Sequence, residues 1–279
     1  MWGSELVGQI PTFQFDEIMT DDVKLLNLLE DLRDIGLTLT KGVPAETGHL
    51  AKFVDRISYL KVTNFGSVHT IKSKTSPNNL AFSGLKLGFH TDLNHYHYKP
   101  NITVFHCIQQ SKTGGESMFA DGFKTALQLK EEDPDAFKTL CDTYCDYIHK
   151  GRRGTVDSCT KCARPTFSFD RYGNIDGVHF DQTSRDIRLH IPVEKVYPYY
   201  KAIKDYYDLI NRPENRVNFR MQPGDIVMLE NTRILHGRNA FTVTEGAERH
   251  LESVFMDWDG VYSKIRCLRE KLGMSFHDY

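Results

Sequence analysis

Residues 88–92, with the sequence GFHTD, combine residue types and a spacing that suit a metal site. His90 and Asp92 are two residues apart at the end of an extended run, so we expect their side chains on the same side of a strand. One imidazole and one carboxylate supply two ligands of a 2-His-1-carboxylate triad, which leaves three positions open on non-haem Fe(II). We expect His236 to be the third ligand, because it follows an apolar strand at 225–230 that begins after a Pro-Gly turn.

A second His-x-Asp pattern, His179 to Asp181, competes with the first one. Apolar residues alternate along the chain over 85–89, immediately before His90, as is typical of a strand. His179 instead follows the sequence NIDG at 174–177, which indicates a turn. This context favours His90 and Asp92 as the metal-binding pair.

Arg249 is a candidate for binding an anion beside the metal. It lies 13 residues after His236 and opens another apolar strand at 251–258. A guanidinium can hold a carboxylate through two parallel hydrogen bonds, so an Arg near a metal centre is suited to a dicarboxylate ligand.

Several motifs occur together and in a characteristic order: FHTD at 89–92, TGGES at 113–117, LHGR at 235–238, RHLE at 249–252 and DWD at 257–259. In this order they resemble the γ-butyrobetaine dioxygenase family, one of the taurine-dioxygenase-like Fe(II)/2-oxoglutarate oxygenases. The resemblance runs from Trp2 to about Leu272. Family members usually carry an N-terminal zinc-binding domain before the segment WGSEL. Here Met1 directly precedes that segment, so the domain is either naturally absent or removed.

The resemblance implies a cofactor and its cosubstrates. Fe(II) would be held by His90, Asp92 and His236, and 2-oxoglutarate by Arg249. Dioxygen would be the second cosubstrate, and ascorbate would support turnover. Ser117, which lies 27 residues after His90, matches a hydroxyl that helps to bind 2-oxoglutarate. The alternative for Ser117 is a hydroxyl that satisfies the backbone of the turn before it.

The resemblance also places the substrate pocket. The positions of an aromatic cage for a trimethylammonium group, together with the residue after HTD, fall on Phe65, His69, Phe82, Phe255 and Leu93. Asn79 matches a residue that helps to hold the substrate carboxylate, and a downstream Asn-Asn pair is replaced here by Asp181 and Gln182.

This chain has Phe, His and Leu where the family has Tyr and Trp. One interpretation is a Phe-rich cage that accepts γ-butyrobetaine and forms carnitine. The alternative is an oxygenase for trimethyllysine or for another small amine, carboxylate or phosphonate. A third hypothesis is a non-catalytic jelly-roll binding protein. The presence of His90, Asp92, His236 and Arg249 argues against it, because a binding module has no need of all four.

Composition excludes some classes of partner. The chain has 279 residues, of which 40% are hydrophobic and 26% charged, with a net charge of −2. This balance gives no electrostatic reason to bind nucleic acid. No apolar stretch approaches the length of a membrane span, and no signal or transit sequence is evident, so we expect a cytoplasmic enzyme with a small-molecule substrate. A helix expected at 260–272 could cover the barrel or form a homodimer contact.

Four cysteines leave a second metal site open. Cys159 and Cys162 have metal-ligand spacing, and Cys141 with Cys145 could complete a zinc site of four thiolates. The alternative is a set of reduced thiols without metal, as is usual in a cytoplasmic protein.

Short strands bounded by Gly and Pro and flanked by helices predict a mainly β fold of the jelly-roll type. The resemblance sharpens this to the double-stranded β-helix of 2-oxoglutarate oxygenases. We expect one catalytic domain over 1–279, with a polar insertion around 148–187 that could fold over the site. Helices are expected at 21–35, 47–60, 121–140, 192–211 and 260–272.

Overall fold

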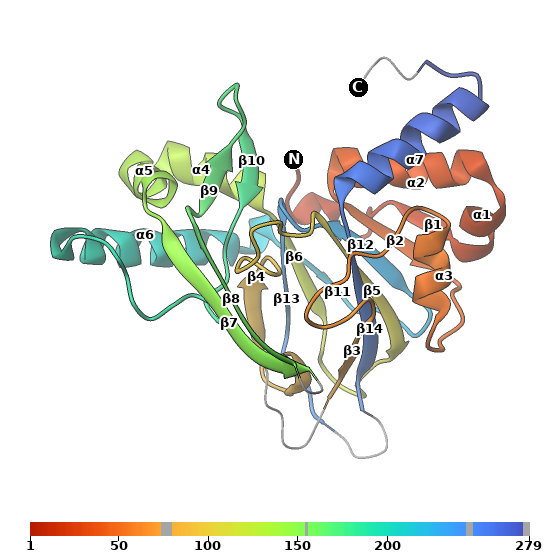
Figure 1. Ribbon diagram of the computed structural model, residues 1–279, viewed down its shortest axis with the longest axis horizontal. Coiled ribbons are helices and arrows are strands. Elements are labelled where there is room, and N and C mark those ends of the chain that lie inside the picture. Colours follow the sequence, from red (N-terminus) through yellow and green to blue (C-terminus); the bar gives the residue numbers. More distant parts are fainter. Residues whose placement is uncertain (74–79, 154–155, 244–247, 276–279) are drawn as a thin grey trace.

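Two stacked β-sheets form the centre of the molecule in a computed structural model that describes residues 1–73, 80–153, 156–243 and 248–275 (Figure 1). The strands of the larger sheet are β1 (Thr12–Gln14), β2 (Leu37–Lys41), β3 (His69–Lys72), β5 (Ile102–Gln109), β12 (Ile226–Glu230) and β14 (His250–Met256). Those of the smaller sheet are β4 (Leu87–His90), β6 (Ser117–Asp121), β11 (Val217–Phe219) and β13 (Ile234–Arg238). The strand orders are β1-β2-β12-β5-β14-β3 and β11-β6-β13-β4, and every pair except β1 with β2 is antiparallel. This is the predicted jelly roll with flanking helices.

Helices cover the outer face of each sheet, as Figure 1 shows. Beside the larger sheet lie α1 (Phe15–Thr20), α2 (Asp22–Ile35), α3 (His49–Asp55) and α7 (Trp258–Lys271). Beside the smaller sheet lie α4 (Gly122–Glu132), α5 (Pro134–Asp142) and α6 (Val193–Ile210). Three short 3-10 helices are η1 (Ser4–Leu6), η2 (Leu80–Phe82) and η3 (Pro213–Asn215). None of the helices in the described ranges is both long and apolar enough to span a membrane.

Successive side chains of a strand point to opposite faces of its sheet, and this divides the core into layers. In β12, Ile226 and Met228 pack against the helices, whereas Val227 and Leu229 point between the two sheets. The space between the sheets is therefore filled by apolar side chains over part of its length, and the candidate site opens where this filling stops.

Local sequence signals explain where the helices begin and end. The Asp21 side chain accepts hydrogen bonds from the first turn of α2, and Gly36 ends this helix with φ 81°. The single helix expected at 121–140 is instead two helices, because Asp133 caps a new helix that has Pro134 in its first turn. The helix expected at 47–60 is shorter, since α3 ends at Asp55.

The segment 148–187 contains two antiparallel hairpins where the sequence indicated a long loop. The first hairpin is β7 (Cys145–Arg153) with β8 (Val156–Arg164), and the second is β9 (Phe167–Phe169) with β10 (Ile175–Val178). Ile148 and His149 of β7 line the cavity of the candidate site. The first hairpin thus forms one wall of this cavity.

Candidate metal centre and active site

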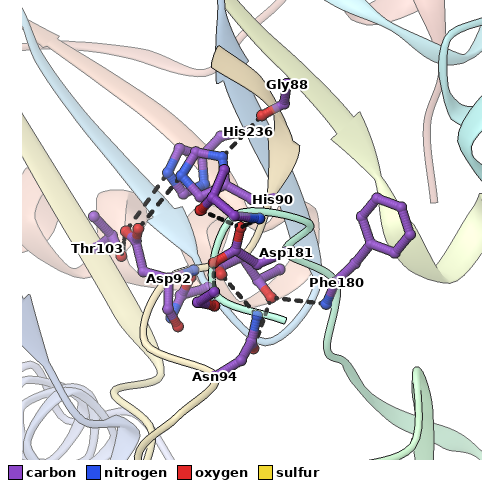
Figure 2. A network of polar contacts seen from close by, with 12 residues as sticks. Gly88, His90, Asp92, Asn94, Thr103, Phe180, Asp181 and His236 are labelled. Carbon is purple, nitrogen blue, oxygen red and sulfur yellow. Dashed lines mark hydrogen bonds and ion pairs between the residues drawn. The ribbon is translucent and has the colours of Figure 1, made fainter. Parts of the chain in front are cut away.

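Pairing of β4 with β13 brings the two predicted histidine ligands together. His236 lies directly opposite His90 in this antiparallel pair, and their ring centroids are 4.3 Å apart. One ligand atom from each of His90, Asp92 and His236 lies within 4.8 Å of the others. Figure 2 shows these three side chains converging. Elsewhere in the described residues, no other group of three His, Cys, Asp or Glu side chains is this close.

Asp92 does not lie on the strand, which corrects the expectation that His90 and Asp92 share one strand face. The strand ends at His90, and Asp92 stands in the turn that follows. Asn231 fixes this turn: its Oδ1 accepts a hydrogen bond from the Asp92 amide (2.6 Å), and its Nδ2 donates to the Asp92 carbonyl (3.1 Å). Thr103 Oγ1 donates to Asp92 Oδ2 (3.1 Å). The Asp92 turn and its carboxylate are therefore positioned by Asn231, which follows β12, and by Thr103 of β5.

The donor set fits a divalent metal ion. His90 Nδ1 donates to the Gly88 carbonyl (2.9 Å), so the other ring nitrogen, Nε2, is directed at Asp92 Oδ1 (3.6 Å). His236 Nε2 lies 3.5 Å from Asp92 Oδ2. Two imidazole nitrogens and one carboxylate oxygen that converge in this way are the ligands of a non-haem Fe(II) site.

Charges in this cluster depend on one another. Burial acts to lower the pKa of His90, but the hydrogen bond and the charge of Asp92 outweigh burial and raise this pKa to about 9. Burial lowers the pKa of His236 to about 3, and the neighbouring His90 adds to the shift. Burial acts to raise the pKa of Asp92, yet His236 and His90 hold it well below its usual range. The metal-free cluster therefore holds one proton on His90 at neutral pH.

We expect metal binding to release this proton. The folded pKa of His90 lies above its ordinary value, so the imidazole is protonated below about pH 9 and must lose its proton before it binds metal. Affinity for Mn(II) should fall as pH decreases from 8 to 6, by about tenfold per pH unit for one displaced proton. Titration calorimetry in buffers of different ionisation enthalpy measures the proton release. An affinity that is independent of pH in this range would contradict the assignment.

The metal cluster faces a cavity of about 440 Å³. At one end, Arg249 is 5% exposed, and its Nε donates to Gln110 Oε1 (3.2 Å). Burial lowers the Arg249 pKa to about 10, so the guanidinium stays protonated at neutral pH. Within the described ranges, no carboxylate forms an ion pair with it. Ser117 lines the same cavity. This end therefore offers a buried positive charge for an anion.

Arg238, the last residue of the motif LHGR, also lines the cavity. Its Nη2 donates to the carbonyls of Ser83 (2.8 Å) and Leu85 (2.5 Å), and its guanidinium lies 4.5 Å from the centroid of the Phe241 ring. Its spacing from His236 could have indicated this position, because residues two apart on a strand point to the same face.

At the substrate end, the structure brings together most of the predicted cage positions. The cavity is lined by Phe65, His69, Leu93 and Phe255. The rings of Phe65 and His69 stack at 4.5 Å. Phe82 meets His69 edge-on at 6.0 Å but does not line the cavity. Asn79 lies outside the described residues.

The Gln182 side chain is exposed and accepts a hydrogen bond from Arg185 Nε (2.9 Å), and it does not line the main cavity. It lines a smaller hollow that also includes His90 and Asp181, so its contact with the substrate stays a prediction. The neighbouring Asp181 also lines the main cavity. His149 also lines it, between Phe65 (5.5 Å) and His95 (5.0 Å). The sequence contains no periodic pattern that predicts the positions of Asp181 and His149 in the cavity.

The four cysteines do not form a metal site. Cys159 and Cys162 lie three residues apart on β8, so their side chains point to opposite faces of the hairpin. Cys159 is exposed, whereas Cys145 and Cys162 are buried. The competing pattern at His179 also fails as a metal pair, because the His179 ring is buried beside Ser168 (3.3 Å) and does not line the cavity.

Comparison with known proteins agrees with this geometry. Residues 2–255 match the model of the taurine catabolism dioxygenase TauD, TfdA family. The chain is 35% identical to human γ-butyrobetaine dioxygenase over 97% of its own length and 69% of that protein. It is 26% identical to mitochondrial trimethyllysine dioxygenase of Bos taurus, over 96% of this chain and 63% of that protein. The fold is similar to PvcB of Pseudomonas aeruginosa, with a TM-score of 0.62 and 20% identity over 83% of this chain and 79% of that chain.

Fold and site together define a Fe(II)- and 2-oxoglutarate-dependent dioxygenase. PvcB is itself described as an Fe, alpha-ketoglutarate dependent oxygenase. The chain belongs to the TauD/TfdA dioxygenase family. The hypothesis of a non-catalytic binding protein is therefore set aside.

Proposed function

We propose that this enzyme hydroxylates an unactivated C–H bond of a small trimethylammonium compound, with γ-butyrobetaine as the first candidate. The observation that carries the proposal is the cluster of His90, Asp92 and His236 at a cavity that is also lined by the rings of Phe65, His69 and Phe255 and by the Arg249 guanidinium. The identity of 35% to human γ-butyrobetaine dioxygenase favours this candidate.

In this proposal, His90, Asp92 and His236 hold Fe(II), which with 2-oxoglutarate and dioxygen supplies the oxidising chemistry. Arg249 binds the distal carboxylate of 2-oxoglutarate, because it is a buried, protonated guanidinium at the far end of the cavity. Ser117, in the same wall, donates a hydrogen bond to this cosubstrate.

The substrate end supplies positioning and excludes water. Phe65, His69 and Phe255 offer ring faces to a quaternary ammonium group, and Leu93 packs beside it. Burial lowers the pKa of His69, so its ring is neutral at pH 7 and does not repel a cation. On one side, the cavity is lined by Ile148 and His149 of the β7/β8 hairpin.

Trimethyllysine is the second candidate. Bovine trimethyllysine dioxygenase matches 96% of this chain, and the cage here differs from the Tyr and Trp expected for γ-butyrobetaine. A homodimer and a cytoplasmic location remain predictions from the sequence.

The test is succinate formation with Fe(II), ascorbate and 2-oxoglutarate, with or without γ-butyrobetaine or trimethyllysine. We expect a quaternary ammonium substrate to stimulate succinate formation at least about tenfold, with one hydroxylated product per succinate, since a bound substrate positions the reacting C–H and excludes water. Slow succinate formation that neither compound stimulates would contradict the proposed substrate class and leave the enzyme class intact.

A further inference from the structure

The substrate half of the cavity contains a buried carboxylate without a cationic partner. Asp181 is 7% exposed and lines the cavity. In the part of the chain that the structure describes, no Lys, Arg or His nitrogen lies within 4.0 Å of its carboxylate. The charge of Asp181 acts on the buried Lys99 and on His90, but neither nitrogen lies within 4.0 Å of the carboxylate. The position of a direct cationic partner is therefore open for a cation that arrives with a ligand.

The hydrogen bonds of Asp181 leave part of the carboxylate unused. Thr183 donates to Oδ1 through its amide (2.8 Å) and its hydroxyl (2.7 Å), and the Ser184 hydroxyl donates to Oδ2. All three donors are neutral and belong to the turn that follows Asp181. A carboxylate accepts about four hydrogen bonds. One acceptor position is therefore left for a donor in the cavity.

Asp181 is held next to the metal centre. Thr91, which stands between two of the proposed metal ligands, donates its amide hydrogen to the Phe180 carbonyl (2.8 Å). The Phe180 amide donates to Thr91 Oγ1 (3.4 Å). These bonds join the segment before Asp181 to the turn that carries Asp92 (Figure 2). A group bound at Asp181 therefore lies close to the substrate carbon presented to the metal.

We infer that Asp181 selects a substrate with a second, N–H-bearing cation, while the methylated ammonium packs on the rings of Phe65 and His69. A trimethylammonium group has no N–H to complete the Asp181 carboxylate, and the stacked rings are the surface that suits it. A substrate whose polar end is only a carboxylate meets like charge at Asp181. This inference rests on the proposed function and, within its class, favours an amino acid such as trimethyllysine over γ-butyrobetaine.

The experiment is anaerobic titration calorimetry of the Fe(II)- and 2-oxoglutarate-loaded enzyme with two ligands, trimethyllysine and Nα-acetyl-trimethyllysine. Both carry the same quaternary ammonium and carboxylate groups, and only the first has the α-ammonium. We expect trimethyllysine to bind the wild-type enzyme about tenfold or more tightly than the acetylated compound, because a charge-assisted hydrogen bond in a buried site is lost on acetylation. Equal affinities, or no saturable binding of either, would overturn the inference without any variant.

Asp181→Asn tests the residue itself. Its amide oxygen still accepts from Thr183, so the turn is retained while the charge is removed. The preference for trimethyllysine over its acetylated form should fall to within about twofold, and γ-butyrobetaine should bind more tightly than in the wild type, since repulsion by the carboxylate is removed. A preference that persists in Asp181→Asn would show that another residue selects the ammonium.

Asp170→Asn is the matched control. Asp170 also accepts backbone hydrogen bonds within a turn, from Tyr172 (2.8 Å) and Asn174 (2.9 Å), but it does not line the cavity. Its substitution should leave the preference unchanged. The succinate assay tests the proposed function separately. If neither ligand stimulated succinate formation but the binding preference were observed, hydroxylation of these ligands would be rejected and Asp181 would still be the cation site.

Discussion

His236→Ala is expected to abolish Fe(II)-dependent succinate formation. His236 is 6% exposed on β13, its Nε2 faces the Asp92 carboxylate, and no other His in the described ranges could take its place in the cluster. Activity should fall by more than about 100-fold, because even substitutions of outer-shell partners of metal ligands cost about 10–100-fold. The measurement is succinate formation at saturating 2-oxoglutarate, together with Mn(II) affinity by calorimetry.

The control separates loss of the metal from loss of the fold. His190→Ala makes the same substitution at a side chain that is 70% exposed and lies outside the cavity, and it should retain full activity. Near-wild-type melting temperature with weak Mn(II) binding in His236→Ala would identify a ligand defect. Retained Fe(II)-dependent turnover in His236→Ala would contradict the assignment of His236 as a metal ligand.

Arg249→Ala is expected to raise the KM for 2-oxoglutarate far more than it changes the affinity for the substrate. Removing one partner of a buried ion pair costs about 3–5 kcal/mol, which corresponds to an increase of about 100-fold to a few thousand-fold in KM. The reason is that the dicarboxylate would lose a buried counter-charge at that end, while the Arg238 side chain is already directed to the carbonyls of Ser83 and Leu85. Initial rates over a range of 2-oxoglutarate concentrations measure the effect.

Two further measurements sharpen the Arg249 test. Arg249→Lys keeps the charge but loses the planar pair of donors, so its KM should lie between those of the wild type and Arg249→Ala. Methylguanidine added to Arg249→Ala should lower the KM again, because it can fill the space left by the guanidinium. If Arg249→Ala changed only the KM of the hydroxylated substrate, the assignment of the cosubstrate end would be wrong.

Helix limits and the jelly-roll class were predictable because their signals are local. Asp21 and Gly36 bound α2 as expected, and Asp133 with Pro134 explains why the run at 121–140 divides into two helices. Residues 226–229 of β12 are all apolar, which predicted a strand buried on both faces, and the two-residue period of a strand places its side chains alternately in the two core layers.

Positions within turns were not predictable in this way. Asp92 was expected on a strand face, yet it stands in a turn that Asn231 holds from 139 residues away. Likewise, Asp181 lines the main cavity, whereas the adjacent Gln182 lines a smaller hollow beside His90. A turn has no repeating period, so contacts from other elements decide which of two adjacent side chains points inward.

The sequence by itself determined the kind of chemistry: two His and one Asp in motifs that match a known order, with Arg249 behind them. Tertiary structure decided what the pocket presents to a substrate. It brought β4 beside β13, left Phe82 at the edge of the cage, and joined the segment before Asp181 to the turn that carries Asp92. The identity of a residue determines which metal or anion its side chain can bind. The direction in which that side chain points in a cavity depends on contacts between segments far apart in the chain.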